Sequence, residues 1–433
     1  MQLSGAPRTG PAVLAPVGVA PAAATGPTPL RASDDASLAA PGASGATRYV
    51  QVPDESQLPP TGAPDAVGSA GWKLWNEQTA TRAIVDAIDG AKRVVNVEFF
   101  GITDGGKGSY VVDALERAAK RGVEVNVLAD STSLFSLPVG SYLRMKDRIE
   151  DAGGTVFSNV RAPIVKSRKD EPALQNVNHR KVVTVDGTTA FTGGINYIKL
   201  EDHFEDSMVQ LSGVSAASLA AEQLDRWQRA NGSASAAHRQ TVADALQGAS
   251  LVPSSPTEMR VLANAPEQQR QELTEAYKDL IRNAKERVWI SSAGYSDQEL
   301  MDLVTDAARR GVDVRMVTSG KAPLGIPVIN WVGQSHLREA MREGAKAVAI
   351  PGIIHRKALI ADDEVVFSSF NMTGRSKEHL HEVGLRTKDP EFVDAVASIV
   401  AKDMERGTSI APERQGVGGR VGDFLVQQLR LNY

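Results

Sequence analysis

Two histidine–lysine pairs have the residue types and the spacing to do chemistry together. The sequence reads NHRKVVTVDG around His179 and Lys181, and IHRKALIADD around His355 and Lys357. On a strand, residues two apart project to the same face, so we expect each pair to point one way from a buried strand. Imidazoles can attack phosphorus or move protons, while neighbouring ammonium groups hold an anion.

The surroundings of the two pairs repeat as well. Each motif has the form H-x-K-x4-D, each is followed by an asparagine in GGIN or SSFN, and each has an acid 27 residues after its histidine. The repeated positions are Asp186 and Asp362, Asn196 and Asn371, and Asp206 and Glu382. One such motif is weak evidence, but its ordered repetition predicts that both copies contribute to one cationic pocket.

A cationic pocket of this kind fits a phosphodiester. The two lysines and the two asparagines would stabilise charge on the non-bridging oxygens in the transition state. One histidine would attack phosphorus, and the other would act as general acid and base; the residues alone do not say which is which. We expect Asp206 and Glu382 to orient the histidines, and Asp186 and Asp362 to be structural residues at strand ends.

The same residues argue against a metal or another cofactor. A lysine lies beside each histidine, and neither cysteines nor paired acidic ligands are nearby. The lysines would supply the positive charge that a divalent ion provides elsewhere. We therefore expect activity that survives a chelator.

Alternating helix and strand patterns must position these residues. The spacing of apolar residues predicts helices over 79–90, 110–121 and 142–152, and strands over 93–100, 123–129, 155–157, 181–185 and 189–192. Gly122 is a good helix terminator. The alternation predicts an α/β fold with mixed sheets flanked by helices.

The α/β unit occurs twice, because LERAAKRGVEVNVLAD at 115–130 resembles VTDAARRGVDVRMVTS at 304–319. We expect a monomer with an internal pseudo-two-fold axis and an active site between the lobes. The expected divisions are a disordered Pro/Ala/Gly-rich tail (1–66), an N-terminal lobe (67–235), a linker (236–256), a C-terminal lobe (257–410) and a C-terminal tail (411–433).

Composition limits the partners. The chain has 433 residues, a net charge of −4, 5% aromatic residues and no cysteine, so a nucleic-acid ligand is disfavoured and disulfides are excluded. No run is long enough to span a bilayer. The N-terminal tail is a flexible segment or an atypical export segment. In the C-terminal tail, Val421, Phe424, Leu425 and Leu429 could form an amphipathic helix that packs on the protein or touches a membrane.

These motifs resemble the phospholipase D superfamily, over about residues 70–405. NVNHRKVVTVDG with GGIN, and FNMTGRS with HEVGL, are similar to the two motifs of bacterial cardiolipin synthase-like proteins, and NVEFF is similar to their early strand with Glu98. The resemblance implies two lobes, metal-independent phosphodiester chemistry and a phosphohistidine, with His179 as nucleophile and His355 as general acid and base. Gly194, Ser369 and Glu98 are further candidate contacts to phosphate or substrate.

We therefore expect hydrolysis or transphosphatidylation of phospholipids, by a cytoplasmic protein or one peripheral to the membrane, with export by an atypical route as another option. A nuclease of the same superfamily and a non-catalytic binding protein are the alternatives.

Overall fold

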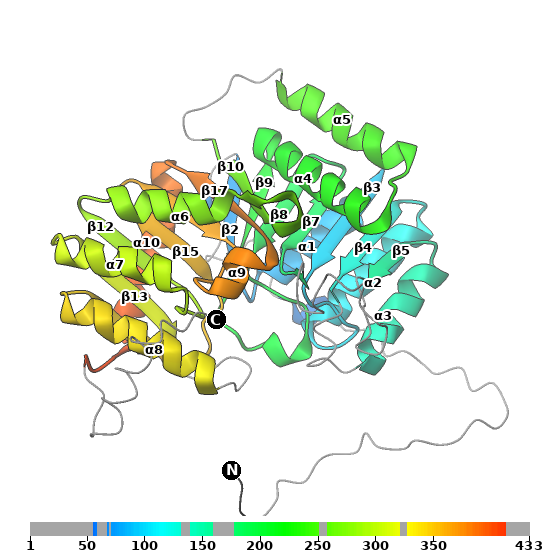
Figure 1. Cartoon of the computed structure of the whole chain (residues 1–433). Helices are drawn as coiled ribbons and strands as arrows, with labels where there is room; N and C mark the ends of the chain where they lie inside the picture. The colour runs from blue at the N-terminus through cyan, green and yellow to red at the C-terminus, as the bar shows by residue number, and fades with distance from the viewer. Residues whose placement is uncertain are drawn as a thin grey trace, which may run out of the picture. The chain divides into compact units, whose positions relative to one another are not determined.

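The computed structural model describes residues 55–58, 67–68, 71–130, 139–158, 177–250, 258–320 and 327–412. Residues 51–433 form one compact unit, in which two α/β lobes follow each other along the chain (Figure 1). Each lobe has a mixed sheet with helices on both faces, so the predicted fold class is confirmed.

The N-terminal lobe is built on an eight-stranded sheet in the order β1-β2-β9-β8-β7-β3-β4-β5. Its strands are β1 (Val67–Gly68), β2 (Trp72–Asn76), β3 (Val94–Phe99), β4 (Glu124–Ala129), β5 (Thr155–Ser158), β7 (Lys181–Val185), β8 (Thr189–Gly193) and β9 (Ser207–Ser212). Its helices are η1 (Glu55–Gln57), α1 (Ala80–Gly90), α2 (Lys107–Lys120), α3 (Val139–Asp151), η3 (Lys199–Glu201), α4 (Gly213–Asn231) and α5 (Ala236–Ser250). Strands β3, β4 and β5 are parallel, and the other neighbours in the order are antiparallel.

The C-terminal lobe repeats this plan with the order β11-β10-β17-β16-β15-β12-β13-β14-β18. Its strands are β10 (Arg260–Ala265), β11 (Arg270–Gln271), β12 (Arg287–Ser291), β13 (Asp313–Ser319), β14 (Lys346–Ile350), β15 (Lys357–Ala361), β16 (Glu364–Ser368), β17 (Leu380–Thr387) and β18 (Thr408–Ser409). Its helices are η4 (Pro266–Gln268), α6 (Glu272–Asn283), α7 (Gln298–Arg309), α8 (Pro327–Arg342), α9 (Gly374–Glu378) and α10 (Pro390–Arg406).

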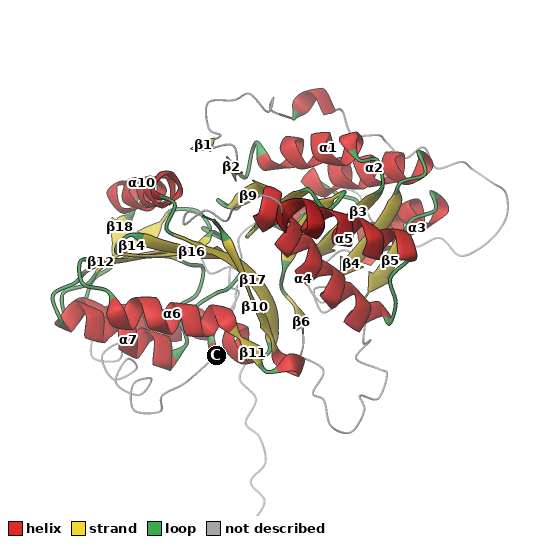
Figure 2. Ribbon diagram, turned by 90° about the horizontal axis from the view of Figure 1, so that it is seen from above, coloured by secondary structure: helices red, strands yellow, loops and turns green. Residues whose placement is uncertain are grey.

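Amphipathic helices bury the faces of both sheets. In α2, the buried side chains Val111, Leu115 and Ala118 lie on one stripe, which packs into the first core with β3 and β4. Figure 2 shows the equivalent layering of the second lobe, with α10 on one side of its sheet and α6 and α7 on the other. The predicted terminator Gly122 and its counterpart Gly311 have φ angles of 85° and 86°, which glycine adopts without strain.

The two lobes share a core, and one short strand of the N-terminal lobe pairs with a strand of the C-terminal lobe. Buried residues of β2, β8 and β9 pack with those of β16, β17 and α10 in one cluster, and the rings of Trp72 and Phe392 meet edge to face at 4.9 Å. The two-residue strand β6 (Val177–Asn178) pairs in parallel with β17 of the other lobe. This crossing brings the segment before β7 against the segment that carries Glu382.

The structure corrects two expected boundaries. Residues 55–58 fall in the predicted disordered tail, but Leu58 is buried in the first core and Glu55 forms an ion pair of 2.6 Å with Arg117. Helix α5 occupies most of the predicted linker 236–256, and it packs on α4 because Val242 and Ala245 form an apolar stripe. The proposed C-terminal amphipathic helix lies outside the described residues.

Within the described ranges, no helix combines the length and the apolar character that crossing a bilayer requires.

Candidate active site

The two histidines lie just before their strands, not within them as the sequence suggested. Strand β7 begins at Lys181 and β15 begins at Lys357, so each histidine belongs to the segment that enters its strand. That segment is held by the opposite lobe. The backbone N–H of His179 donates to the carbonyl of His381 at 3.0 Å, and the N–H of His355 donates to the carbonyl of Glu205 at 2.8 Å.

Each histidine contacts an acid from the other lobe. Nδ1 of His179 lies 2.9 Å from Oε1 and 3.0 Å from Oε2 of Glu382. Nδ1 of His355 lies 2.8 Å from Oδ2 of Asp206 and 3.1 Å from the carbonyl oxygen of Gly194. The two acids expected to orient the histidines therefore do contact them, and they do so in a crossed arrangement that the sequence did not specify.

The residues before each asparagine support the acids. The hydroxyl of Ser369 donates to Glu382, while the equivalent residue in the first lobe is Gly194. A Cβ at Gly194 would lie 2.3 Å from Oδ1 of Asp206, so only glycine leaves room for that carboxylate. The structure thus places Gly194 and Ser369 against the acids, whereas we had expected them at the phosphate.

Both lysines are completely buried beside the histidines. Nζ of Lys181 donates to the carbonyl of His179 at 2.6 Å, and Nζ of Lys357 donates to the carbonyl of His355. The Phe100 ring lies 5.4 Å from Nζ of Lys181 and 5.3 Å from the His179 ring. Each ammonium group is therefore fixed next to an imidazole, in a place where an anion would be strongly attracted.

Burial makes the lysines unusually acidic. It lowers the pKa of Lys181 to about 8 and that of Lys357 to about 7, and the nearby carboxylates of Glu382 and Asp206 offset only part of this effect. The positive charge of Lys181 further lowers the pKa of Lys357. A site with such lysines is prepared for a negative ligand that restores their charge.

The acids of the two histidine–acid pairs have pKa values that are shifted in opposite directions. Burial, followed by the charges of Lys181 and Lys357, lowers the pKa of His179 well below 6.5. Burial also raises the pKa of its partner Glu382 to about 8. His179 is therefore a neutral imidazole at neutral pH.

The pKa of Asp206 is lowered, in contrast to that of Glu382. Burial favours its neutral form, but the hydrogen bond and the charge of His355 outweigh burial and lower the carboxyl pKa below 3.8. Asp206 is therefore ionised at neutral pH, and it can stabilise a proton on His355. The nearly symmetric sequence motifs thus give the two histidines partner acids whose pKa values are shifted in opposite directions.

The two asparagines also lie in different surroundings. Asn196 accepts a hydrogen bond from the N–H of Gly101 at 3.3 Å and donates to Glu201 at 2.9 Å. The buried Oδ1 of Asn371 has no partner among the described residues.

Asp186 and Asp362 follow β7 and β15, at the ends of these strands that are distant from the histidines. Asp186 accepts from the backbone N–H groups of Lys92, Arg93 and Val94 at 2.8–3.0 Å. Asp362 accepts from Lys285, Glu286 and Arg287 in the same way. Both aspartates hold the start of the neighbouring strand, β3 or β12.

Glu98 does not face the catalytic pair. It is buried on the α4 side of the first sheet, and its Oε1 lies 4.0 Å from Nε of Arg226. Because β3 alternates its faces, Glu98 projects away from the core side on which Phe99 lies. Glu98 therefore lies on the other face of β3 from Phe99, and its contact with phosphate or substrate stays a prediction.

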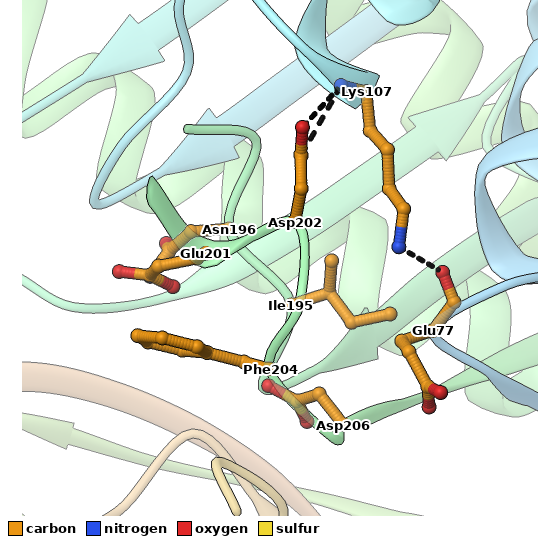
Figure 3. A pocket seen from close by; sticks show the side chains of 8 residues that line it. All are labelled: Glu77, Lys107, Ile195, Asn196, Glu201, Asp202, Phe204 and Asp206. Atoms are coloured by element: carbon orange, nitrogen blue, oxygen red, sulfur yellow. Dashed lines mark hydrogen bonds between the residues drawn. The ribbon is translucent and has the colours of Figure 1, made fainter. Parts of the chain in front are cut away.

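Figure 3 shows a pocket that sequence reasoning did not predict, and its lining includes Asp206, the partner of His355. It is lined by Glu77, Lys107, Ile195, Asn196, Glu201, Asp202, Phe204 and Asp206. The Phe204 ring also lies 5.8 Å from the His355 ring. The repeat marks Asn196 and Asp206 among these residues, but it does not mark Phe204, because the equivalent position in the second copy is Leu380.

Comparisons with known proteins agree with this geometry. A family model described as "Cardiolipin synthase, PLD-like domain" matches residues 84–227 and 277–404. Cardiolipin synthase A of Pseudomonas putida (strain W619) is 30% identical over 361 residues, which are 81% of this chain and 71% of that protein. Cardiolipin synthase 2 of Bacillus anthracis is 26% identical, over 79% of this chain and 66% of that protein.

A solved structure has the same fold. The crystal structure of phosphatidylserine synthase from Haemophilus influenzae superposes with a TM-score of 0.62 at 13% identity, covering 84% of this chain and 94% of that one. At this identity, the likeness supports the two-lobed fold alone.

Proposed function

The chain belongs to the phospholipase D superfamily, in its cardiolipin synthase-like branch, and from this premise we propose that it transfers phosphatidyl groups between alcohols. The donor is a phospholipid, whose phosphodiester is cleaved at the head-group oxygen. An alcohol acceptor, such as the free hydroxyl of phosphatidylglycerol, gives a new phospholipid, and water gives phosphatidic acid. The crossed histidine–acid pairs above two buried lysines are the observation that carries this proposal.

His179 is the proposed nucleophile. With Nδ1 directed to Glu382, its Nε2 is left to attack phosphorus. The P–O bond to the head group breaks as the N–P bond forms. The neutral state of His179 favours this role, because a protonated imidazole has no lone pair to offer.

His355 is the proposed general acid and base. Its partner Asp206 is ionised and stabilises the imidazolium, which gives a proton to the leaving oxygen. The neutral imidazole then takes the proton of the acceptor hydroxyl, whose oxygen attacks phosphorus and releases His179. Throughout, Lys181 and Lys357 stabilise the charge on the non-bridging oxygens.

Product analysis tests this function. The protein is incubated with vesicles of phosphatidylglycerol and phosphatidylethanolamine, and separately with single-stranded DNA, and the products are identified by mass spectrometry. We expect new or hydrolysed phospholipids and intact DNA. Cut DNA with unchanged lipid would assign the chain to nucleic-acid chemistry instead.

The same assay tests independence from metal ions. The charges of Lys181 and Lys357 occupy the place where a divalent cation would otherwise neutralise the phosphate. We expect the rate to be unchanged in excess EDTA. A loss that one particular metal restores would contradict the lysine-based site.

A further inference from the structure

Exposed apolar side chains lie on three helical elements of the N-terminal lobe, α3, η3 and α5. Among the described residues, the large hydrophobic side chains that are exposed are Val139 (51%), Leu143 (49%), Leu200 (54%) and Leu246 (41%). The first three lie on the first turns of α3 and on η3. We define the rim surface as Val139, Leu143 and Leu200 with the exposed cations Arg144 and Lys199.

The two parts of the rim surface flank one loop. The N–H of Asp104 donates to the carbonyl of Ser141 in α3 at 3.0 Å. On the other side of this loop, the N–H of Lys107 donates to the carboxylate of Asp202, which directly follows η3, at 3.1 Å. The loop 102–107 therefore forms hydrogen bonds both with α3 and with the residue that follows η3.

The rim surface borders the proposed active site. Leu200 is followed by Glu201, whose carboxylate accepts from the Asn196 side chain at 2.9 Å and lines the pocket beside the histidines (Figure 3). Helix α3 follows β4, which runs parallel to β3 and ends at Ala129 opposite Phe99. Since Phe100 contacts His179, α3 starts from the edge of the sheet where the site lies.

Packing among the described residues of the lobe does not explain the apolar residues of the rim surface. Tyr142, Met145 and Ile149 are the buried residues of α3, and they cover the sheet. Val139 and Leu143 lie on a different stripe that faces outward. A helix face that meets only water normally carries polar residues there.

We propose that the rim surface rests on the headgroup region of a bilayer that contains anionic phospholipids. This inference rests on the proposed function, since the phosphate of a phospholipid lies in the bilayer interface and the site must reach it. Leu143, Val139 and Leu200 then enter the interface, while Arg144 and Lys199 lie among the anionic headgroups. The arrangement brings the mouth of the pocket to the level of the scissile phosphodiester.

Vesicle binding of a rim variant tests the proposal. The double variant Val139→Ser/Leu143→Ser is compared with Leu246→Ser, which removes the remaining exposed leucine. Leu246 is on α5, whose Asp244 pairs at 2.7 Å with Arg93 at the opposite end of β3. Co-sedimentation with vesicles of phosphatidylglycerol and phosphatidylcholine should weaken roughly tenfold for the rim variant and stay unchanged for Leu246→Ser.

A second, water-soluble substrate distinguishes an effect on membrane binding from an effect on the reaction itself. Hydrolysis of the water-soluble diester bis(p-nitrophenyl) phosphate should stay at the wild-type rate in both variants, because it needs no interface. Phospholipid turnover should fall in the rim variant alone. The wild type could bind vesicles without converting phospholipids, while the rim variant binds vesicles more weakly. This result would contradict the proposed function and still support the rim surface.

Three results would contradict the proposal that the rim surface binds a membrane. The first is equal vesicle binding by the rim variant and the wild type. The second is a wild type that does not bind anionic vesicles at all. The third is a wild-type dimer in light scattering that Val139→Ser/Leu143→Ser converts to a monomer, which would assign the surface to a second copy of the chain.

Discussion

At the scale of single residues, the main feature of the site is two buried lysine side chains. Lys181 and Lys357 are fully buried, and they lie beside histidines that are also mostly buried. Burying two ammonium groups costs stability, so their retention indicates that they serve a ligand. The lowered lysine pKa values make this ligand dependence measurable.

The pH dependence of anion binding is one such measurement. Lys357, with a pKa of about 7, and Lys181, with a pKa of about 8, are charged below these values and neutral above them. The affinity for tungstate, which stays a dianion in this range, should therefore fall roughly tenfold or more as the pH rises from about 6 to 9. Isothermal titration calorimetry measures it. Burial holds the pKa of His179 well below 6.5. The carboxyl of Glu382, with a pKa of about 8, becomes charged over the same range, and this weakens anion binding in the same direction.

Lys357→Met provides the control for the pH dependence. This variant should bind tungstate weakly and with a flatter pH profile, because one of the two titrating charges is missing. A wild-type affinity that is constant or rises over the same range would show that the lysines do not hold the anion.

At the scale of elements, the aspartate of each H-x-K-x4-D motif has a structural role in positioning a strand. Asp186 and Asp362 have φ angles of 52° and 51°, a region that aspartate and asparagine tolerate better than most residues, and each binds three backbone N–H groups. They fix β3 and β12 against β7 and β15. Lys181 and Lys357 begin those same strands, so the aspartates act on the proposed site only through the sheet.

Substituting Asp186 should therefore affect stability and not chemistry. Asp186→Ala leaves three amides unpaired and places alanine at a positive φ, which should cost roughly 2 kcal/mol of unfolding free energy. Asp186→Asn keeps an acceptor and should cost less. Chemical denaturation gives the free energies, and kcat of the folded protein at low temperature should be unchanged. A kcat that collapses in a fully folded Asp186→Asn would make this aspartate part of the chemistry.

At the scale of the whole molecule, each histidine–acid pair is formed by residues of both lobes. Glu382 serves His179 and Asp206 serves His355, so neither lobe contains a complete pair. The parallel pairing of β6 with β17 and the shared core connect the two lobes. The lobes must therefore act as one unit.

The crossed pairing predicts different defects for the two acids. Glu382→Gln should impair the attack by His179 and slow the first step roughly 10²–10⁴-fold for every diester, as loss of an orienting carboxylate does in other sites. Asp206→Asn should slow diesters with alkoxide leaving groups, which need a proton from His355, and spare nitrophenyl diesters, which do not. Stopped-flow bursts on both substrates compare the variants. The reversed pattern would exchange the roles of the two histidines.

Much of this organisation could be predicted from the sequence, because repeats and periodicity are local. The α/β duplication, the strand after Lys181 and the terminator Gly122 all follow from short-range patterns. The position of Glu98 could not be foreseen, since a motif says nothing about which face of β3 a residue occupies. The crossing of Glu382 to His179 depends on how the two lobes pack, and Phe204 has no counterpart in the repeat. The burial of Leu58 depends on a docking contact that composition cannot reveal.

The central claim is that two nearly identical motifs divide the work, with His179 as nucleophile and His355 as acid and base. Bis(p-nitrophenyl) phosphate needs no acid for its first step, so His355→Ala should release one nitrophenolate per protein and then stop. Intact and peptide mass spectrometry should find the nitrophenyl phosphoryl group on His179 in this variant and no adduct in His179→Ala. An adduct on His355 in His179→Ala, or no adduct in either variant, would contradict the account.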